Sequence, residues 1–538
     1  MPTRRLFLAT AGRGLVLLGA PALKLPSQSR YDLVLRSGTV FDGTGATGRE
    51  ADVAIAGDRI VAVGRRLRAR GREEIDVRDR AVAPGFSDLH SHADGTLFQD
   101  PRAESVIRQG ITTVVVGADG GSRAPGSDGN ASFQSFFDRV REAGSSVNVA
   151  TMVGLGRIRR VVIGETDRRP TPAELERMTA MVQTALASGA CGASTGLEYT
   201  PGAYATTAEL IALCRPLVVR RLPYATHMRD EEELLLEALD EAIAIARGAG
   251  CRLQISHLKT NGRKNWSKFD GVISRIERAK SGGMDVAFDR YPYVAWHSGL
   301  TVFVPVWALE GGSMAFLRRL DDPATAPRIR TETFEKVETN GGWNSIQISE
   351  VEVDADRGAV GQRLDQLART RNEDPYETMT GLLRRNAASV GVVGFGMSEE
   401  NLERFLRHPL GMACTDGGSH AVEGPARSGH PHPRGLGSYP RILGRYVRER
   451  KVLTLEEAVW KMSGFPASRV RLGDRGRLAA GLAADVVVFD PATVTDRATF
   501  EQPFQYPEGL DLVIVNGAVT FRQGTRDRLG AGRPVRPG

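Results

Sequence analysis

Short apolar runs separated by helical patterns organise the middle of this chain and restrict its possible folds. They lie at residues 82–89, 112–117, 147–154, 190–197, 222–228, 253–258, 285–293 and 411–415. Such alternation favours parallel strands joined by crossover helices. The first seven runs are spaced by about 30 to 40 residues, close to the roughly 31 residues per unit of a 250-residue eightfold barrel. We therefore predict an α/β fold built on a (β/α)8 TIM-like barrel.

The eighth run arrives late, more than a hundred residues after the seventh. This gap predicts an insertion with a small subdomain around 300–375. Both ends of the chain instead show alternating strands joined by tight turns, at 32–35 and 51–55 and again at 485–489 and 512–519. We expect the two ends to pair into one small β-sandwich.

At 538 residues the chain exceeds the roughly 250–300 residues of a single core. The predicted organisation has a signal at 1–30 and the first part of the sandwich at 31–81. The barrel with its insertion occupies 82–469, and the second part of the sandwich follows at 470–538.

The charge pattern and the cysteines exclude several classes of protein. Lys and Arg total 71 against 64 for Asp and Glu, a net charge of +7, but the charges are interspersed. This pattern indicates a solvated basic surface and no nucleic-acid partner. No apolar run reaches the roughly 18 to 20 residues of a membrane span, so we expect no stable membrane insertion. The four scattered cysteines predict neither a disulfide framework nor a zinc ribbon. The oligomeric state stays open.

The first residues are typical of a twin-arginine export signal. Arg4 and Arg5 precede a small and apolar run that extends to Ala20, although Arg13 interrupts it. This pattern predicts a periplasmic or extracellular protein. If the segment is only a basic tail, the protein would be cytoplasmic.

A histidine pair, His90 and His92, ends the first apolar run. Alternate side chains of a strand point to the same face, so the two imidazoles can bind one ion. Zinc and similar ions prefer such ligands. A His-x-His pair in a polar loop is the structural alternative.

Further candidate ligands occur at the ends of later runs. His227 ends the fifth run, His257 the sixth, and Asp416 follows the eighth. Barrel enzymes gather their chemistry at the carboxyl ends of their strands. A lone strand-end histidine or an Asp before Gly has a structural explanation. The coincidence of these positions in a chain with nine histidines instead predicts a metal site.

This constellation resembles that of the amidohydrolase superfamily, and five segments resemble its D-aminoacylase (N-acyl-D-amino-acid deacylase) family. These segments are 110–117, 194–202, 289–293, 432–441 and 505–509. The resemblance covers nearly the whole chain after the signal. It implies a barrel with a split β-domain, one or two Zn²⁺ ions, and hydrolysis of small-molecule N-acyl-D-amino acids to a carboxylate and a D-amino acid.

One departure from the family concerns the acid that completes the metal site. D-aminoacylases typically carry a cysteine ligand after strand 2, where this chain has Asp119. A carboxylate can also ligate zinc, although an Asp in a Gly-rich loop is commonly a turn residue. Glu198, just past strand 4, is the second candidate, and we slightly favour it as the bridging ligand.

The expected chemistry assigns further roles. Asp416 would take a proton from the attacking water and return it to the departing amine; the alternative is a ligand role alone. The resemblance implies that Lys259, Tyr199 and Tyr291 hold the substrate carboxylate, with Arg434 a lesser candidate. Tyr199 fits a core position equally well, because Tyr-x-Pro-Gly is a turn setting.

Two other functions remain open. One is another amidohydrolase reaction, on a cyclic amide or an unusual peptide linkage. The other is a non-catalytic exported binding protein on an inherited barrel, which would be expected to lose ligands that this chain retains. The preference for acyl chain and side chain is not fixed by the sequence.

Overall fold

A barrel of parallel strands forms the centre of the protein, as the computed structural model shows for residues 31–126 and 132–538. The segment 1–30, with the predicted export signal, lies outside the described residues. In chain order the barrel strands are β6 (Phe86–Asp88), β7 (Ile111–Val116), β8 (Asn148–Thr151) with its continuation β9 (Val153–Gly154), β10 (Ala193–Gly196), β11 (Pro223–His227), β12 (Arg252–Ile255), β13 (Val286–Arg290) and β17 (Gly411–Ala413).

Hydrogen bonds between the segments after β6 and β17 close the barrel. The Asp416 amide donates to the His90 carbonyl over 2.9 Å, and the His92 amide donates to the Gly417 carbonyl over 2.9 Å. The remaining neighbours pair in parallel around the ring. The predicted (β/α)8 barrel is confirmed, and its closure brings strand 1 and strand 8 together.

Helices cover the outside of the barrel. They are α1 (Glu104–Ile107), α2 (Phe133–Ala143), α3 (Leu155–Val162), α4 (Pro172–Ala187), α5 (Thr207–Cys214), α6 (Leu217–Arg220), α7 (Leu235–Ala249), α8 (Phe269–Ser281), α13 (Glu399–Arg407), α14 (Arg434–Arg441), α15 (Leu455–Met462) and α16 (Gly464–Arg469). Among the described residues no helix is long and apolar enough to cross a membrane.

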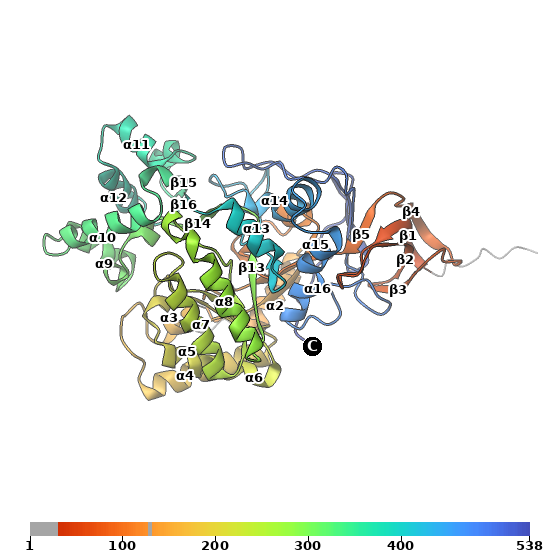
Figure 1. The fold of residues 1–538 in the computed structure, drawn as a ribbon, viewed down its shortest axis with the longest axis horizontal. Coiled ribbons are helices and arrows are strands. Elements are labelled where there is room, and N and C mark those ends of the chain that lie inside the picture. The colour runs from red at the N-terminus through yellow and green to blue at the C-terminus, as the bar shows by residue number, and fades with distance from the viewer. Residues whose placement is uncertain (1–30, 127–131) are drawn as a thin grey trace, which may run out of the picture.

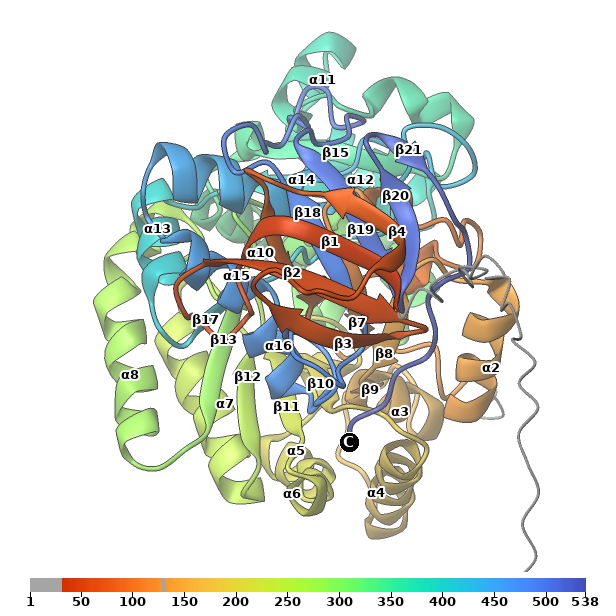
Figure 2. The same ribbon diagram turned by 90° about the vertical axis from the view of Figure 1, so that its right-hand side faces the viewer.

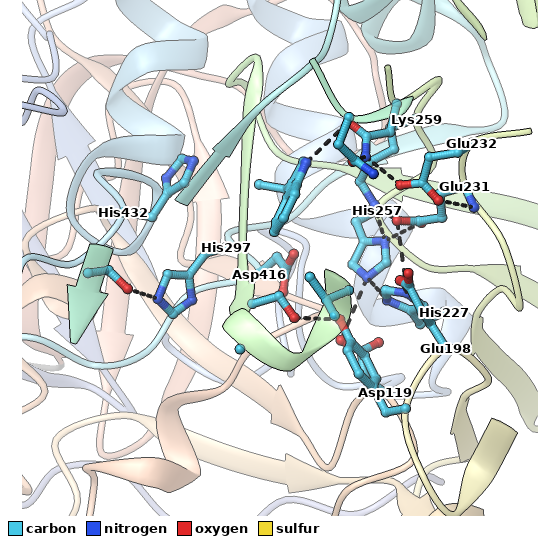
Figure 3. Close-up of a pocket in the computed structure, with 18 of the residues that line it drawn as sticks. Asp119, Glu198, His227, Glu231, Glu232, His257, Lys259, His297, Asp416 and His432 are labelled. Atoms are coloured by element: carbon cyan, nitrogen blue, oxygen red, sulfur yellow. Dashed lines mark hydrogen bonds and ion pairs between the residues drawn. The ribbon is translucent and has the colours of Figure 1, made fainter. Parts of the chain in front are cut away.

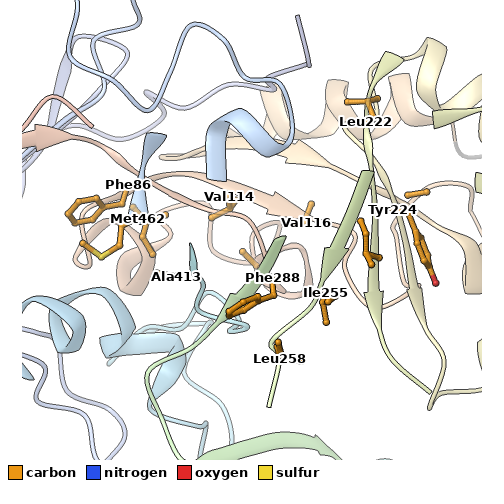
Figure 4. Packing of buried hydrophobic residues seen from close by; sticks show 14 of the residues in the cluster. Phe86, Val114, Val116, Leu222, Tyr224, Ile255, Leu258, Phe288, Ala413 and Met462 are labelled. Carbon is orange, nitrogen blue, oxygen red and sulfur yellow. The ribbon is translucent and has the colours of Figure 1, made fainter. Parts of the chain in front are cut away.

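Alternation along the strands separates two apolar layers. Val114 and Val116 of β7 belong to the large cluster that also holds Tyr224, whereas Val115 packs with Ala225 and others in a smaller cluster. Figure 4 shows side chains of the larger cluster on neighbouring strands. Because successive side chains of a strand point to opposite faces, this is the pattern expected of a sheet buried on both sides.

The two chain ends form one β-domain, as predicted. Its strands are β1 (Tyr31–Val40), β2 (Arg49–Ala56), β3 (Arg59–Gly64), β4 (Gly71–Asp76), β5 (Ala81–Pro84), β18 (Val486–Phe489), β19 (Leu510–Val515), β20 (Ala518–Arg522) and β21 (Thr525–Arg526). Strand β5 joins the halves, since it pairs with β1 and with β18. Leu35, Val53, Val486 and Ile514 share its core. Figure 2 shows the two halves side by side.

The run 82–89, predicted as one barrel strand, is two strands that meet at Gly85. Residues up to Pro84 belong to β5 in the β-domain, and the barrel begins with β6. A Cβ on Gly85 would lie 2.3 Å from Oγ1 of Thr112, so no larger residue fits at this crossing. The boundary between the two domains therefore falls after Pro84 rather than after residue 81.

The insertion before the last barrel strand is larger than the predicted 300–375. It consists of β14 (Ala295–Gly299), α9 (Ser313–Asp321), α10 (Ala326–Thr339), β15 (Ile346–Val351), α11 (Leu364–Arg371), α12 (Pro375–Arg385) and β16 (Val390–Phe395). Its strands form an antiparallel sheet, and Phe316, Ile329 and Leu383 belong to its core. Figure 1 shows the insertion and the β-domain on opposite sides of the barrel.

Candidate metal centre

Four of the predicted strand-end residues, His92, His227, His257 and Asp416, line one cavity, and Figure 3 shows three of them, His227, His257 and Asp416. The imidazoles of His90 and His92 follow β6, His227 ends β11, His257 follows β12, and Asp416 follows β17. Four side chains, His90, Asp119, His257 and Asp416, each offer a ligand atom within 4.8 Å of all the others. The geometry thus brings histidines from distant segments to one carboxylate-rich point.

Asp119 lies at the centre of this cluster. Its Oδ2 atom is 3.2 Å from Nε2 of His90, 3.4 Å from Nε2 of His92 and 3.6 Å from Nε2 of His257. Donors of a tetrahedral zinc ion, bound at about 2.0–2.1 Å, are about 3.3 Å apart. The Oδ1 atom of Asp119 is buried and has no hydrogen-bond partner within the described part of the chain. The residues present therefore fit a bound metal ion.

Asp416 connects the cluster to Arg434. Its Oδ1 atom lies 3.0 Å from Nε2 of His92 and 3.4 Å from Nε2 of His90, while Oδ2 lies 2.7 Å from Nη1 of Arg434. Burial alone would raise the pKa of this carboxyl, but the charges of Arg434 and His90 outweigh it and hold the pKa well below its usual value. Asp416 is therefore an ionised carboxylate that can accept a proton.

Each of three histidines presents one ring nitrogen to the centre and the other to a carboxylate behind it. The pairs are His90 Nδ1 with Asp289 Oδ1 at 3.3 Å, His257 Nδ1 with Glu231 Oε1 at 3.2 Å, and His227 Nε2 with Glu198 Oε2 at 3.0 Å. Such outer carboxylates fix the tautomer and orientation of metal-bound histidines. The Nδ1 atom of His227 meanwhile lies 2.9 Å from Nε2 of His257, so both rings face the same point.

The structure distinguishes the two candidates for the bridging acid, Glu198 and Asp119. Glu198 contacts His227, and its Oε1 atom lies 4.0 Å from Nζ of Lys336 on α10. Neither of the two donor groups that the described residues form includes Glu198. The structure brings Asp119, rather than Glu198, against the two strand-1 histidines.

Glu231 belongs to a second group of possible donors with His227 and His257. The Lys259 ammonium, however, donates to Oε2 of Glu231 at 2.5 Å. A cation so close opposes a metal ion at the same carboxylate. Glu231 therefore fits the role of an outer carboxylate better than that of a ligand.

The backbone of the centre is strained at three of its residues. Asp119, His257 and Asp416 have φ angles of 50°, 33° and 49°, in the left-handed region. Each such residue costs on the order of 1–3 kcal/mol and persists only where its surroundings enforce it. Gly196 of β10 supplies one such constraint, because a Cβ there would lie 2.4 Å from the Asp119 carbonyl oxygen.

The residues predicted to hold the substrate all line the same cavity, which has a volume of about 960 Å³. Lys259 is already paired with Glu231, and Nζ lies 2.8 Å from Nδ1 of His257. The Tyr199 hydroxyl accepts a hydrogen bond from Ser298. The Tyr291 hydroxyl is buried without a hydrogen-bond partner among the described residues. The Arg434 guanidinium lies 4.7 Å from the centre of the Tyr291 ring.

Several residues of the site were not predicted. Asp289 lies in β13, so the rule that located the other strand-end residues could also have found it. Glu231 follows His227 by four residues and had no such signal. Val302, Trp307 and Lys336 of the insertion line the cavity, and sequence patterns do not place an insertion over a barrel.

Comparison with known proteins agrees with this geometry. The model of an amidohydrolase family matches residues 428–521. The D-aminoacylase of Alcaligenes xylosoxydans xylosoxydans is 36% identical over 94% of this chain and 97% of its own length. A crystal structure of N-acyl-D-glutamate deacylase from Bordetella bronchiseptica, with zinc and a phosphonate that mimics the tetrahedral intermediate, is 34% identical. It covers 94% of this chain and 99% of its own, with a TM-score of 0.80. A D-aminoacylase structure concerned with a binuclear metal centre has 35% identity over 94% of this chain and 100% of its own, and a TM-score of 0.80.

Proposed function

This chain belongs to the D-aminoacylase family of amidohydrolases, and we propose that it hydrolyses the amide bond of N-acyl-D-amino acids. The products are a carboxylate and a free D-amino acid. The observation that carries the proposal is the convergence of His90, His92, Asp119, His257 and Asp416 beside a cavity large enough for such a substrate.

Zinc is the cofactor that this donor set fits, with one or two ions. Asp119 would be the donor common to both sides of the site, because its Oδ2 atom lies 3.2 Å from Nε2 of His90 on strand 1 and 3.6 Å from Nε2 of His257 on strand 6. Zinc supplies Lewis-acid chemistry when bound, since it lowers the pKa of water to about 7 and polarises a carbonyl oxygen.

Asp416 performs the proton transfers. Its ionised carboxylate accepts a proton from the attacking water and delivers it to the amide nitrogen, so that the amine leaves neutral. Arg434 keeps this carboxylate charged and fixes Oδ2, which leaves Oδ1 directed at the histidines. The same group thus works first as a base and then as an acid.

Arg434 and Tyr291 form the proposed anchor for the substrate carboxylate. The hydroxyl of Tyr291 has hydrogen-bonding capacity to spare, and the guanidinium of Arg434 has N–H donors beyond the one used by Asp416. Lys259 instead holds Glu231, the carboxylate whose Oε1 atom lies 3.2 Å from Nδ1 of His257. Tyr199 packs against the His227 ring, with centroids 4.7 Å apart, and so forms a wall of the site.

Paired N-acyl-D- and N-acyl-L-amino acids test this proposal. We expect turnover of the D-substrates, with the L-enantiomers slower by at least about a hundredfold in kcat/KM, a difference of about 2.7 kcal/mol. Cyclic amides should be tested in the same panel. The second candidate function is another amidohydrolase reaction on such substrates, and the presence of Asp119 where the family has a cysteine favours it. Turnover of cyclic amides alone would replace our assignment.

We further propose that the protein is exported through the twin-arginine route. The support is the pair Arg4 and Arg5 ahead of an apolar run that extends to Ala20. A reporter fused to residues 1–30 should leave the cytoplasm, and replacement of both arginines by lysine should retain it there. Retention of the unaltered fusion would contradict export.

A further inference from the structure

A second cavity, of about 830 Å³, adjoins the metal centre. His92, Asp119 and Tyr199 line both this cavity and the one that holds Arg434 and Tyr291. A substrate whose scissile carbonyl lies at the centre can therefore extend into two separate spaces. The proposed proton transfers and carboxylate anchor use no residue that lines only the second cavity.

Arginines dominate the charge of the second cavity. Its wall includes Arg123, Arg139 on α2, and Arg157 and Arg160 on α3, with glycines between them. Among the described residues that line it, the acids are Asp94 and Asp119, and Asp119 belongs to the metal centre. The cavity therefore carries an excess of positive charge.

Contacts with neighbouring groups hold these guanidinium groups in place without using all of their N–H donors. Arg160 donates from Nη2 to the Thr200 carbonyl over 3.0 Å and from Nε to the Glu165 carboxylate. Arg123 donates from Nη2 to the Gly95 carbonyl over 3.2 Å, and its Nε atom lies 3.9 Å from Oδ2 of Asp94. Arg139 lies over Phe98, 4.4 Å from its ring centre. Because a guanidinium carries five N–H donors, Arg123, Arg139 and Arg160 each retain donors that can bind an anion.

Among the charged residues that line the first cavity away from Arg434 and Tyr291, acids predominate. Asp230, Glu232 and Glu335 line it at the side of the insertion. Lys336 also lines this side, but the acids outnumber it. An anionic chain is repelled from that side and attracted to the arginines.

We propose that the second cavity receives the acyl half of the substrate and selects acyl chains that end in an anionic group, such as those of dicarboxylic acids. This inference rests on the proposed function. The amino-acid half, anchored by Arg434 and Tyr291, occupies the first cavity, so the acyl chain must leave the metal centre in the other direction. Guanidinium groups match a terminal carboxylate in charge and geometry.

N-succinyl and N-butyryl derivatives of one D-amino acid provide the first test. The two acyl chains have four carbons each and differ in the terminal carboxylate. We expect kcat/KM for the succinyl substrate to be at least about tenfold higher, as one charge-assisted hydrogen bond allows. The advantage should shrink at high salt, because Arg123, Arg139 and Arg160 are exposed. Equal rates, or faster hydrolysis of the butyryl substrate, would overturn the proposal.

Matched arginine variants locate the effect. Arg139→Gln and Arg160→Gln should each lower the ratio of succinyl to butyryl kcat/KM by several-fold, up to about tenfold. Arg141→Gln is the control, because Arg141 lies on α2 and, like Arg160, pairs with an acid, but it does not line the cavity. A ratio that falls equally in all three variants would overturn the assignment.

Direct binding separates this inference from the proposed function. Calorimetric titration of the zinc-loaded protein with succinate and butyrate needs no turnover, and succinate should bind more tightly. Inorganic phosphate is the third ligand. If phosphate binds but succinate has no advantage over butyrate, the cavity is a free-anion site and the acyl assignment is wrong. If succinate is preferred but neither substrate is hydrolysed, only the proposed function fails.

Discussion

The Oδ2 atom of Asp119 lies 3.2 Å from Nε2 of His90. This contact places an aspartate where the family resemblance predicts a cysteine, and it gives the centre oxygen and nitrogen donors alone. Its consequences can be measured through metal content, stability and turnover.

Replacement of Asp119 should remove metal. We expect Asp119→Ala to weaken zinc binding by more than a hundredfold, because three histidines lose their common neighbour. Asp119→Cys should restore binding, since thiolate is also a zinc ligand. Zinc content by atomic emission and competition with a chelator give both values.

Glu198→Gln is the matched comparison. Glu198 lies behind His227, so we expect zinc affinity to fall by only about 10- to 100-fold, as for other outer carboxylates. If this variant loses all its zinc while Asp119→Ala keeps a full complement, our assignment of the two acids is reversed.

Asp416→Asn should slow hydrolysis by about 10²- to 10⁴-fold in kcat, the contribution of a positioned acid or base. The amide can still contact the metal through its oxygen, so zinc should remain bound. Steady-state kinetics and metal analysis on the same preparation separate loss of the proton carrier from loss of the ion. Full activity in this variant would exclude the proposed role.

Gly196→Ala tests the support of the Asp119 loop. The new methyl group would lie 2.4 Å from the Asp119 carbonyl oxygen, so the loop must shift. We expect a loss of about 1–3 kcal/mol in the free energy of unfolding and weaker zinc binding. Gly95→Ala is the control, because a Cβ at Gly95 meets no atom within 4 Å. Equal thermal stability of the two variants would contradict the close approach.

Zinc loading should depend on pH. Burial lowers the pKa of His92, but the carboxylates of Asp119 and Asp416 outweigh it and raise this pKa to about 9. The same competition, with Glu231 and Glu198, raises the pKa of His227 to about 9. In the metal-free protein both rings are therefore imidazolium cations below about pH 9, and zinc must displace the extra proton from each.

Affinity for zinc should accordingly rise as pH increases from about 6 to 9 and level off above that value. Titration calorimetry in buffers of different ionisation enthalpy measures the protons released. An affinity independent of pH over this window would show that the rings are neutral before zinc binds.

The strand-end rule could predict much of the site from the sequence. It located His90, His227, His257 and Asp416 because parallel strands of a barrel end at one rim. The choice between Asp119 and Glu198 could not be made, since it depends on the left-handed backbone at Asp119 and on packing against Gly196. Such contacts join segments that are distant in the chain and leave no local pattern.

In the fold, too, local patterns predicted some features, whereas others depend on contacts between distant segments. Apolar periodicity predicted the barrel and the β-domain, whereas the break at Gly85 depends on contact with Thr112. The extent of the insertion depends on the pairing of β14 with β16, whose residues lie about a hundred positions apart. The cavity wall that Trp307 and Lys336 provide was therefore beyond sequence patterns.

The most direct test of the central claim is the turnover of one N-acyl-D-amino acid by the protein before and after removal of zinc, with its L-enantiomer measured in parallel. We predict hydrolysis of the D-substrate by the zinc-loaded protein, loss of at least about a hundredfold in kcat/KM after chelation, and recovery when zinc is restored. Undiminished hydrolysis by the metal-free protein, or equal rates on both enantiomers, would contradict the account.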